Sequence, residues 1–131
     1  MTQPYIKLSN VDFMNKILVV DDDLDILTLV KITLTMNDFT VEAISAWENI
    51  DNSIVNFEPD LILLDVSLVG ADGRDICKKL KQAKETQHIP VILFSANIDM
   101  GDNIERYHAQ AFIAKPYELS HLLQTIRLYL N

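Results

Sequence analysis

Polar side chains that could share one chemical task follow four separate apolar runs in this 131-residue chain. The four positions are Asp21 with Asp22, Asp65, Ser95 and Lys115. Carboxylates without histidine or thiolate partners favour Mg²⁺ or Mn²⁺ over Zn²⁺. An aspartate can form an acyl phosphate, while a hydroxyl and an ammonium group stabilise the charge of the transferring phosphoryl group. The residue types therefore indicate metal-assisted phosphoryl transfer.

The elements that would position these side chains are short buried strands. Apolar runs bounded by turn residues are typical of parallel strands covered on both faces. The predicted strands are residues 16–20, 39–43, 61–64, 91–94 and 111–114. Because the carboxyl ends of parallel strands meet at one edge, where α/β proteins bind ligands, we expect the polar side chains to be neighbours there.

Helical spacing of apolar residues alternates with the strands. Leu27, Val30 and Leu34 predict a helix that Asp23 caps, and Ile50, Ile54 and Phe57 predict the next one. Three more helices are predicted over residues 74–84, over residues 98–108 and from residue 119 to the end. The order predicts a single doubly wound α/β domain over residues 14–131, with a central five-stranded parallel sheet and five helices. Residues 1–13 are interpreted as an extension that the fold does not need: a vector-encoded leader, an alternative start or a docking arm.

Composition excludes several classes of protein. The formal charge of −8 and the pI near 4.6 argue against a nucleic-acid or anionic-membrane partner. Cys77 is the only cysteine, which excludes an internal disulfide and fits a reducing compartment. The sequence has no apolar run of membrane-spanning length and no apolar core of a signal peptide, so we expect a soluble, cytoplasmic protein.

From about Asn15 to Asn131 the chain resembles the response-regulator receiver domains of bacterial two-component systems, and in particular single-domain regulators of the chemotaxis type. The motifs that carry the resemblance are Lys16-Ile-Leu-Val-Val-Asp-Asp-Asp23, Asp60-Leu-Ile-Leu-Leu-Asp65, Ile89-Pro-Val-Ile-Leu-Phe-Ser-Ala96 and Ala114-Lys-Pro116. The resemblance implies a flavodoxin-like fold with strand order 2-1-3-4-5. One departure is Val69, which stands where the family usually has proline, so we expect the loop after Asp65 to be less rigid.

The resemblance also implies roles for individual residues. Asp21, Asp22, Asp65 and the backbone carbonyl of Ser67 would bind Mg²⁺ or Mn²⁺, and Asp65 would accept the phosphoryl group. Ser95 would bond a phosphate oxygen and move with the aromatic switch residue Phe112. Lys115 would pair with the phosphoryl group, and the peptide bond to Pro116 would be cis.

The implied function is a phosphorylation-dependent signalling switch, with no separate substrate to turn over. A sensor histidine kinase or a histidine phosphotransfer protein would donate the phosphoryl group, and the domain would promote its own phosphorylation and dephosphorylation with Mg²⁺. Phosphorylation would then change the affinity of a face built from the helix over 98–108, the strand over 111–114 and the last helix. The downstream partner would be an unidentified protein rather than DNA or a membrane, and a phosphorylation-dependent homodimer is a further expectation.

Two other functions stay open at this point. The segment Val20-Asp21-Asp22-Asp23 also resembles the nucleophile motif of haloacid-dehalogenase-like phosphatases, although Asp65 would then have no comparable role. A receiver fold could also serve as a binding module without phosphorylation. Taken singly, the acidic residues could favour a helix N-terminus, Asp65 and Lys115 could form a structural ion pair, and Ser95 could satisfy a turn.

Overall fold

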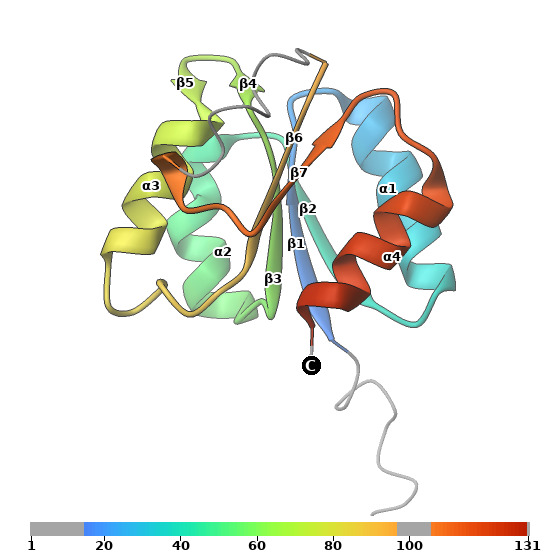
Figure 1. Ribbon diagram of the computed structural model, residues 1–131, viewed down its shortest axis with the longest axis horizontal. Helices are drawn as coiled ribbons and strands as arrows, with labels where there is room; N and C mark the ends of the chain where they lie inside the picture. Colours follow the sequence, from blue (N-terminus) through green and yellow to red (C-terminus); the bar gives the residue numbers. More distant parts are fainter. Residues whose placement is uncertain (1–14, 97–105, 131) are drawn as a thin grey trace, which may run out of the picture.

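A five-stranded parallel sheet forms the centre of the protein (Figure 1). The computed structural model describes residues 15–96 and 106–130. The strands of this sheet, in chain order, are β1 (Lys16–Val20), β2 (Thr40–Ile44), β3 (Leu61–Asp65), β6 (Val91–Ser95) and β7 (Ala111–Ala114). Their spatial order is β2-β1-β3-β6-β7, which is the expected 2-1-3-4-5 order of the flavodoxin-like fold.

Helices cover both faces of the sheet (Figure 1). Helices α1 (Leu24–Met36) and α4 (Leu119–Tyr129) lie on one side, and α2 (Ile50–Phe57) and α3 (Gly73–Gln82) lie on the other. Because successive side chains of a strand point to opposite faces, the apolar runs supply two cores at once. Ile17 and Leu63 pack with α1 and α4, whereas Leu18 and Ile62 pack on the face of α2 and α3. The central strands are therefore apolar on both faces, as the sequence predicted.

The capping residues explain where two of the helices begin. Asp23 Oδ1 accepts the backbone N–H groups of Asp25 (2.9 Å) and Ile26 (3.3 Å), so the predicted cap of α1 is confirmed. Asp72 caps α3 in the same way, because its Oδ1 accepts the N–H of Arg74 at 2.8 Å. Helix α1 begins shortly after β1, and α3 begins directly after β5. The two caps therefore help to fix the loops around the carboxyl edge of the sheet.

Apart from shifts of one or two residues at the ends of β3, β6, α3 and α4, the predicted elements differ from the structure in three places. Strand β2 is displaced by one residue from the predicted 39–43. Two residues each form β4 (Ser67–Leu68) and β5 (Ala71–Asp72), a small antiparallel hairpin that the sequence did not predict because strands this short have no measurable period. The described part of the chain holds four α-helices rather than five, since the helix predicted over 98–108 falls largely on residues outside the described ranges.

No helix among the described residues is long and apolar enough to cross a membrane. The extension predicted over residues 1–13 lies outside the described residues, as does Asn131. The single cysteine, Cys77, belongs to α3 and is fully buried in the core.

Candidate functional site

The register of the sheet brings Asp21 and Asp65 to the same edge. Strands β1 and β3 pair with Val20 opposite Leu64, so each aspartate is one position beyond that pair. Both aspartates are almost excluded from solvent, at 1% exposure for Asp21 and 5% for Asp65. Two buried carboxylates that face one crevice repel each other, and the site must offset that repulsion.

Lys115 is the cation that meets both carboxylates. It follows β7, and its Nζ lies 2.8 Å from Asp21 Oδ2 and 3.6 Å from Asp65 Oδ2. Only the shorter contact is a hydrogen bond. The ammonium group also lies 4.7 Å from the centre of the Phe94 ring, which adds a cation–π contact. Lys115 is therefore bound mainly to Asp21 and shared with Asp65, within reach of a group attached to Asp65.

The environment of Asp65 raises its pKa from 3.8 to about 6. Burial is the largest cause, and the negative charge of Asp21 adds to it. The charge of Lys115 and the N–H of Ser67, which lies 3.3 Å from Asp65 Oδ1, lower the pKa and oppose these effects. The ionised form of Asp65 therefore has a higher free energy in the folded protein than in water.

A glycine lets helix α3 approach Asp65. The N–H of Gly73 donates to the carbonyl of Val66 at 2.8 Å, and a Cβ atom at position 73 would lie 2.0 Å from the backbone oxygen of Asp65. No side chain fits in that space, so the first turn of α3 can lie this close only with glycine. The contact of Gly73 with the Asp65 backbone depends on how α3 packs, which no local sequence pattern reveals.

The expected metal ligands are only partly assembled. In the part of the chain that the structure describes, no three Asp, Glu, His or Cys side chains form a group ready to hold a metal ion. Asp22 Oδ2 accepts the N–H of Val69 at 2.6 Å, and Asp21 is bound to Lys115. The donors nevertheless suit a hard divalent cation, because two buried carboxylates whose repulsion Lys115 relieves only in part offer the oxygen ligands that Mg²⁺ and Mn²⁺ prefer.

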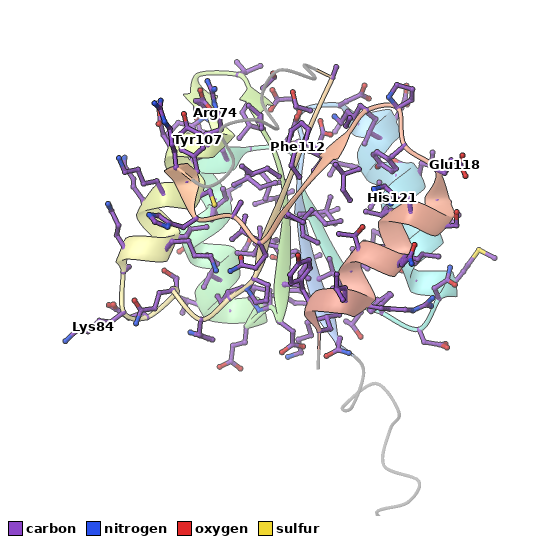
Figure 2. All side chains as sticks on the ribbon, in the orientation of Figure 1. Arg74, Lys84, Tyr107, Phe112, Glu118 and His121 are labelled. Carbon is purple, nitrogen blue, oxygen red and sulfur yellow. The ribbon has the colours of Figure 1, made fainter. Side chains whose placement is uncertain are left out.

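The expected switch residues lie on neighbouring strands. Ser95 ends β6 at 1% exposure, pairs in register with Ala114, and its carbonyl accepts the N–H of Lys115 at 2.8 Å. Phe112 is half-buried on β7 and packs on the face of α2 and α3, near the centre of the molecule in Figure 2. The peptide bond between Lys115 and Pro116 is cis, as expected. The structure thus places Ser95 beside the strand that leads to Lys115.

The loop after Asp65 has contacts that the sequence did not reveal. Trp47, in the 3₁₀ helix η3 (Trp47–Asn49), donates its Nε1–H to the carbonyl of Val69 at 2.9 Å. The indole packs against the core on the face of α2 and α3, and it also reaches the β4–β5 hairpin. This contact crosses between two loops, and a pattern within one segment could not predict it.

A second contact between distant segments of the chain involves Arg74, at the start of α3. Arg74 forms an ion pair with Asp72 at 2.5 Å, and its guanidinium lies 5.5 Å from the ring centre of Tyr107 (Figure 2). The contact joins the start of α3 to the segment before β7.

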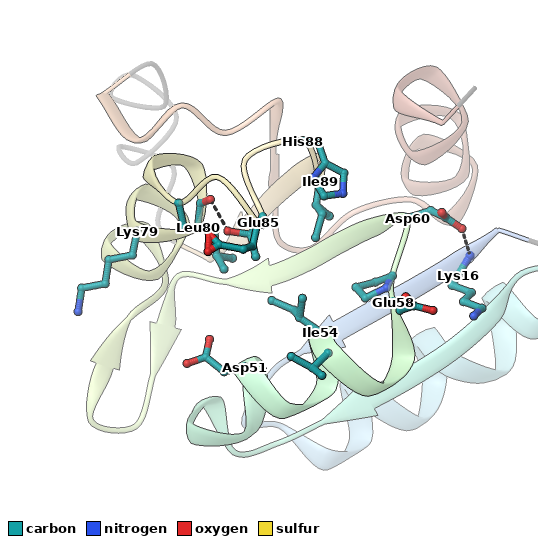
Figure 3. Close-up of a pocket in the computed structure, with 14 residues that line it drawn as sticks. Lys16, Asp51, Ile54, Glu58, Asp60, Lys79, Leu80, Glu85, His88 and Ile89 are labelled. Atoms are coloured by element: carbon teal, nitrogen blue, oxygen red, sulfur yellow. Dashed lines mark hydrogen bonds between the residues drawn. The ribbon is translucent and has the colours of Figure 1, made fainter.

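One groove of the described structure lies far from these residues (Figure 3). This groove of about 970 Å³ is lined by Lys16 at the start of β1, Asp60 before β3 and Ile89 before β6, together with residues of α2 and α3. Its lining thus lies at the amino ends of the strands. Since ligands of α/β sheets bind at the carboxyl ends, we place the functional site at the opposite edge.

Comparison with known sequences identifies relatives over most of the chain. The sequence model of the response regulator receiver domain matches residues 17–127. A DNA-binding dual master transcriptional regulator of Synechocystis, RpaA, is 33% identical over 122 residues, which cover 90% of this chain and 50% of that protein. The response regulator ArlR of Staphylococcus aureus is 30% identical over 121 residues, 90% of this chain and 53% of that protein. The chain therefore spans about half the length of these relatives.

Solved structures agree with the fold. The BeF3-activated N-terminal receiver domain of RstA from Klebsiella pneumoniae superposes with a TM-score of 0.81 at 28% identity, covering 89% of this chain and 99% of that one. A chemotaxis protein from Vibrio cholerae has the same TM-score of 0.81 at 22% identity, covering 89% of this chain and 99% of that one. This second comparison concerns the fold alone.

Proposed function

The chain belongs to the family of response-regulator receiver domains, and we propose that it is a phosphorylation-dependent switch with Asp65 as its phosphoacceptor. A carboxylate oxygen of Asp65 attacks the phosphorus of a phosphohistidine on a sensor histidine kinase or histidine phosphotransfer protein. The new O–P bond forms as the N–P bond breaks, and the imidazole keeps the electron pair. The product is an aspartyl phosphate.

The observation behind this proposal is the position of Asp65 between two groups that stabilise negative charge, a backbone N–H and an ammonium group. Asp65 is buried at the end of β3, with the N–H of Ser67 at one carboxylate oxygen and Lys115 3.6 Å from the other. Lys115 already lies on the side from which it could pair with a phosphoryl oxygen. The raised pKa leaves a more basic carboxylate, which favours nucleophilic attack once the group is ionised.

The residues that would hold a divalent cation are Asp21, Asp22, Asp65 and the carbonyl of Ser67. Bound Mg²⁺ or Mn²⁺ would supply positive charge for the phosphoryl oxygens. Asp21 and Asp65 bring the buried charges that such an ion would balance, and Lys115 supplies part of that balance without it. We propose that the domain promotes its own phosphorylation and dephosphorylation through this set of residues.

The proposed output uses the strands beside Asp65. Ser95 bonds a phosphoryl oxygen, Phe112 follows it, and the face formed by residues 98–108, β7 and α4 changes its affinity for a protein target or for a second copy of the chain. The proposed domain comprises residues 14–131, with residues 1–13 as a dispensable extension, and the proposed location is the cytoplasm. The DNA binding in the name of RpaA belongs to that relative.

A phosphatase of the haloacid-dehalogenase type would need Asp21 as its nucleophile. Both oxygens of Asp21 are engaged, since Oδ1 accepts the N–H of Asp23 at 2.9 Å and Oδ2 accepts from Lys115. Together with the family membership, this favours Asp65 as the acceptor.

Intact mass after incubation with acetyl phosphate tests the proposal. With Mg²⁺ the wild type should gain one phosphoryl group, while a sample in chelator and the variant Asp65→Asn should gain none. Asp60→Asn is the matched control, because Asp60 precedes the same strand at its amino end, where it accepts the N–H of Lys16 at 2.8 Å.

The possible results separate the functions that the sequence left open. Metal-dependent gain in the wild type and in Asp60→Asn, but not in Asp65→Asn, supports the switch. A folded wild type that gains nothing would contradict it and favour a module that binds without phosphorylation. Hydrolysis of a phosphate ester that Asp21→Asn alone abolishes would favour the phosphatase.

A further inference from the structure

Two hydrogen bonds hold the backbone of Val69 from opposite sides. Its N–H donates to Asp22 Oδ2 at 2.6 Å, and its carbonyl accepts the indole N–H of Trp47 at 2.9 Å. Asp22 follows β1 and Trp47 follows β2, so a single residue of the β4–β5 hairpin links the loops after both strands. These residues also line a hollow of about 360 Å³ beside the site.

Core packing holds the ends of this loop through Leu68 and Ala71, but it does not hold Val69 itself. The side chain of Val69 is 78% exposed, and Gly70 turns the chain with a φ of 81°. The strands on either side, β4 and β5, have only two residues each, and a hairpin this small is not stable by itself. The two hydrogen bonds are therefore the described contacts that fix Val69 relative to the rest of the site.

The bond to Asp22 has a direct effect on the site. A carboxylate that accepts a backbone N–H is held in one orientation, and the charge makes this bond stronger than one between neutral groups. Ligating carboxylates are generally oriented by such outer hydrogen bonds. Because the N–H and the carbonyl of Val69 flank the same Cα atom, the indole that holds the carbonyl also limits the directions in which the N–H can point.

We propose that Trp47 is a positioning residue for Asp22, acting through the backbone of Val69. Trp47 holds the loop, the loop orients the Asp22 carboxylate, and the oriented carboxylate binds the divalent cation more tightly. This inference rests on the proposed function, because it assigns Asp22 to the cation. Val69 has the N–H that a proline at this position would lack, so this chain can hold the loop by hydrogen bonds.

The test is a Mg²⁺ titration of the wild type and of Trp47→Phe, followed by the backbone amide NMR signals of residues 21–23 and 65–69. Phenylalanine keeps an aromatic ring but loses the N–H donor. We expect the dissociation constant for Mg²⁺ to rise about tenfold, the lower end of what loss of an outer-shell partner costs. The rate of phosphorylation by acetyl phosphate at saturating Mg²⁺ should equal that of the wild type, since Trp47 touches no reacting atom.

Thr86→Val is the matched control. Thr86 Oγ1 also donates to a backbone carbonyl, that of Leu80 at 2.6 Å, but at the amino edge of the sheet. Its loss should leave the Mg²⁺ affinity unchanged. In the wild type the indole N–H signal, unique because Trp47 is the only tryptophan, should shift along the same binding curve as the Val69 amide. This second measurement does not depend on a variant that folds.

The results separate the failure of this inference from that of the proposed function. If the wild type binds Mg²⁺ and Trp47→Phe binds it within a factor of two, Trp47 has only a packing role and the inference is wrong. An indole signal that stays still while the Val69 amide shifts also contradicts it. If the wild type shows no Mg²⁺-dependent shift at all, the metal site of the proposed function fails together with this inference.

Discussion

The two edges of the central sheet use charged side chains in opposite ways. At the amino edge two charged side chains bond to backbone atoms: Asp60 accepts the N–H of Lys16, and Lys81 Nζ donates to the carbonyls of Gln87 and Ile89. At the carboxyl edge Asp21 and Asp65 are buried together with one shared cation, Lys115. The amino edge is thus held together by its polar groups, while the carboxyl edge keeps a surplus of negative charge.

This difference supports the carboxyl edge as the proposed functional site. The groove lined by Lys16, Asp60 and Ile89 is at the amino edge, where Asp60 closes a loop by accepting a backbone N–H. The carboxyl site contains the carboxylate with the raised pKa, which is typical of functional positions. Perturbed charge, rather than the size of a hollow, marks the site in this protein.

Lys115→Met is expected to have the largest effect on the free energy of unfolding, and it tests the difference between the two edges. Without the ammonium group Asp21 and Asp65 lack their shared partner, and breaking a buried ion pair in this way typically costs about 3 kcal/mol. We expect urea unfolding at pH 7 in chelator to show a loss of this size, and Mg²⁺ to recover part of it.

Lys81→Met is the control for that prediction. Lys81 donates to neutral carbonyls, so its loss should cost only about 1 kcal/mol, and Mg²⁺ should recover none of it. Equal losses for the two variants, with equal response to Mg²⁺, would show that the edges do not differ.

A second effect, of opposite sign, is expected from Asp65→Asn. The pKa of Asp65 is higher in the folded protein (about 6) than its ordinary value of 3.8, so between these values the folded state binds more protons than the unfolded state. This contribution to stability is present at low pH and is lost as the pH rises through about 6. In chelator at pH 7.5, Asp65→Asn should therefore be more stable than the wild type by about 2 kcal/mol.

The pH dependence distinguishes this cause from others. Urea unfolding at pH 5 should show a smaller gain for Asp65→Asn, because most of the wild-type protein is then protonated at Asp65. A gain that is the same at both pH values would mean that the charge of Asp65 is not its source, and a loss at pH 7.5 would contradict the proposed cost of this charge.

The smallest effect is expected at the amino edge from Asp60→Ala. The variant loses the hydrogen bond from the Lys16 N–H, which is worth about 1 kcal/mol. Phosphorylation by acetyl phosphate, normalised to folded protein, should stay unchanged. A clear fall in the phosphorylation rate of the folded variant would contradict this prediction, since it would mean that the amino edge affects the site at the carboxyl edge.

The features that the sequence predicted are those marked by a pattern within one segment of the chain. Apolar runs predicted all five strands of the main sheet, most clearly β1, β3 and β6, whose apolar residues are buried on both faces. The strand order came from the resemblance, and the structure confirmed it. The edge that gathers Asp21, Asp65 and Lys115 followed from parallel strands alone.

The features that the sequence missed depend on contacts between distant segments. Trp47 and Val69 are 22 residues apart, and neither has a pattern that marks the bond between them. The contact of Gly73 with the backbone of Asp65 depends on how α3 packs. Lys115 binds Asp21 more closely than Asp65, a preference that only side-chain geometry reveals.

Asp65 is the proposed phosphoacceptor, so the position of the phosphoryl group on the chain decides whether the proposal is right. Wild-type protein phosphorylated with acetyl phosphate and Mg²⁺ can be reduced with borohydride, which converts an aspartyl phosphate to homoserine, and the altered residue can be found by tandem mass spectrometry. Homoserine at position 65 is the predicted result. Homoserine at position 21 or 22, with aspartate intact at position 65, would contradict the account.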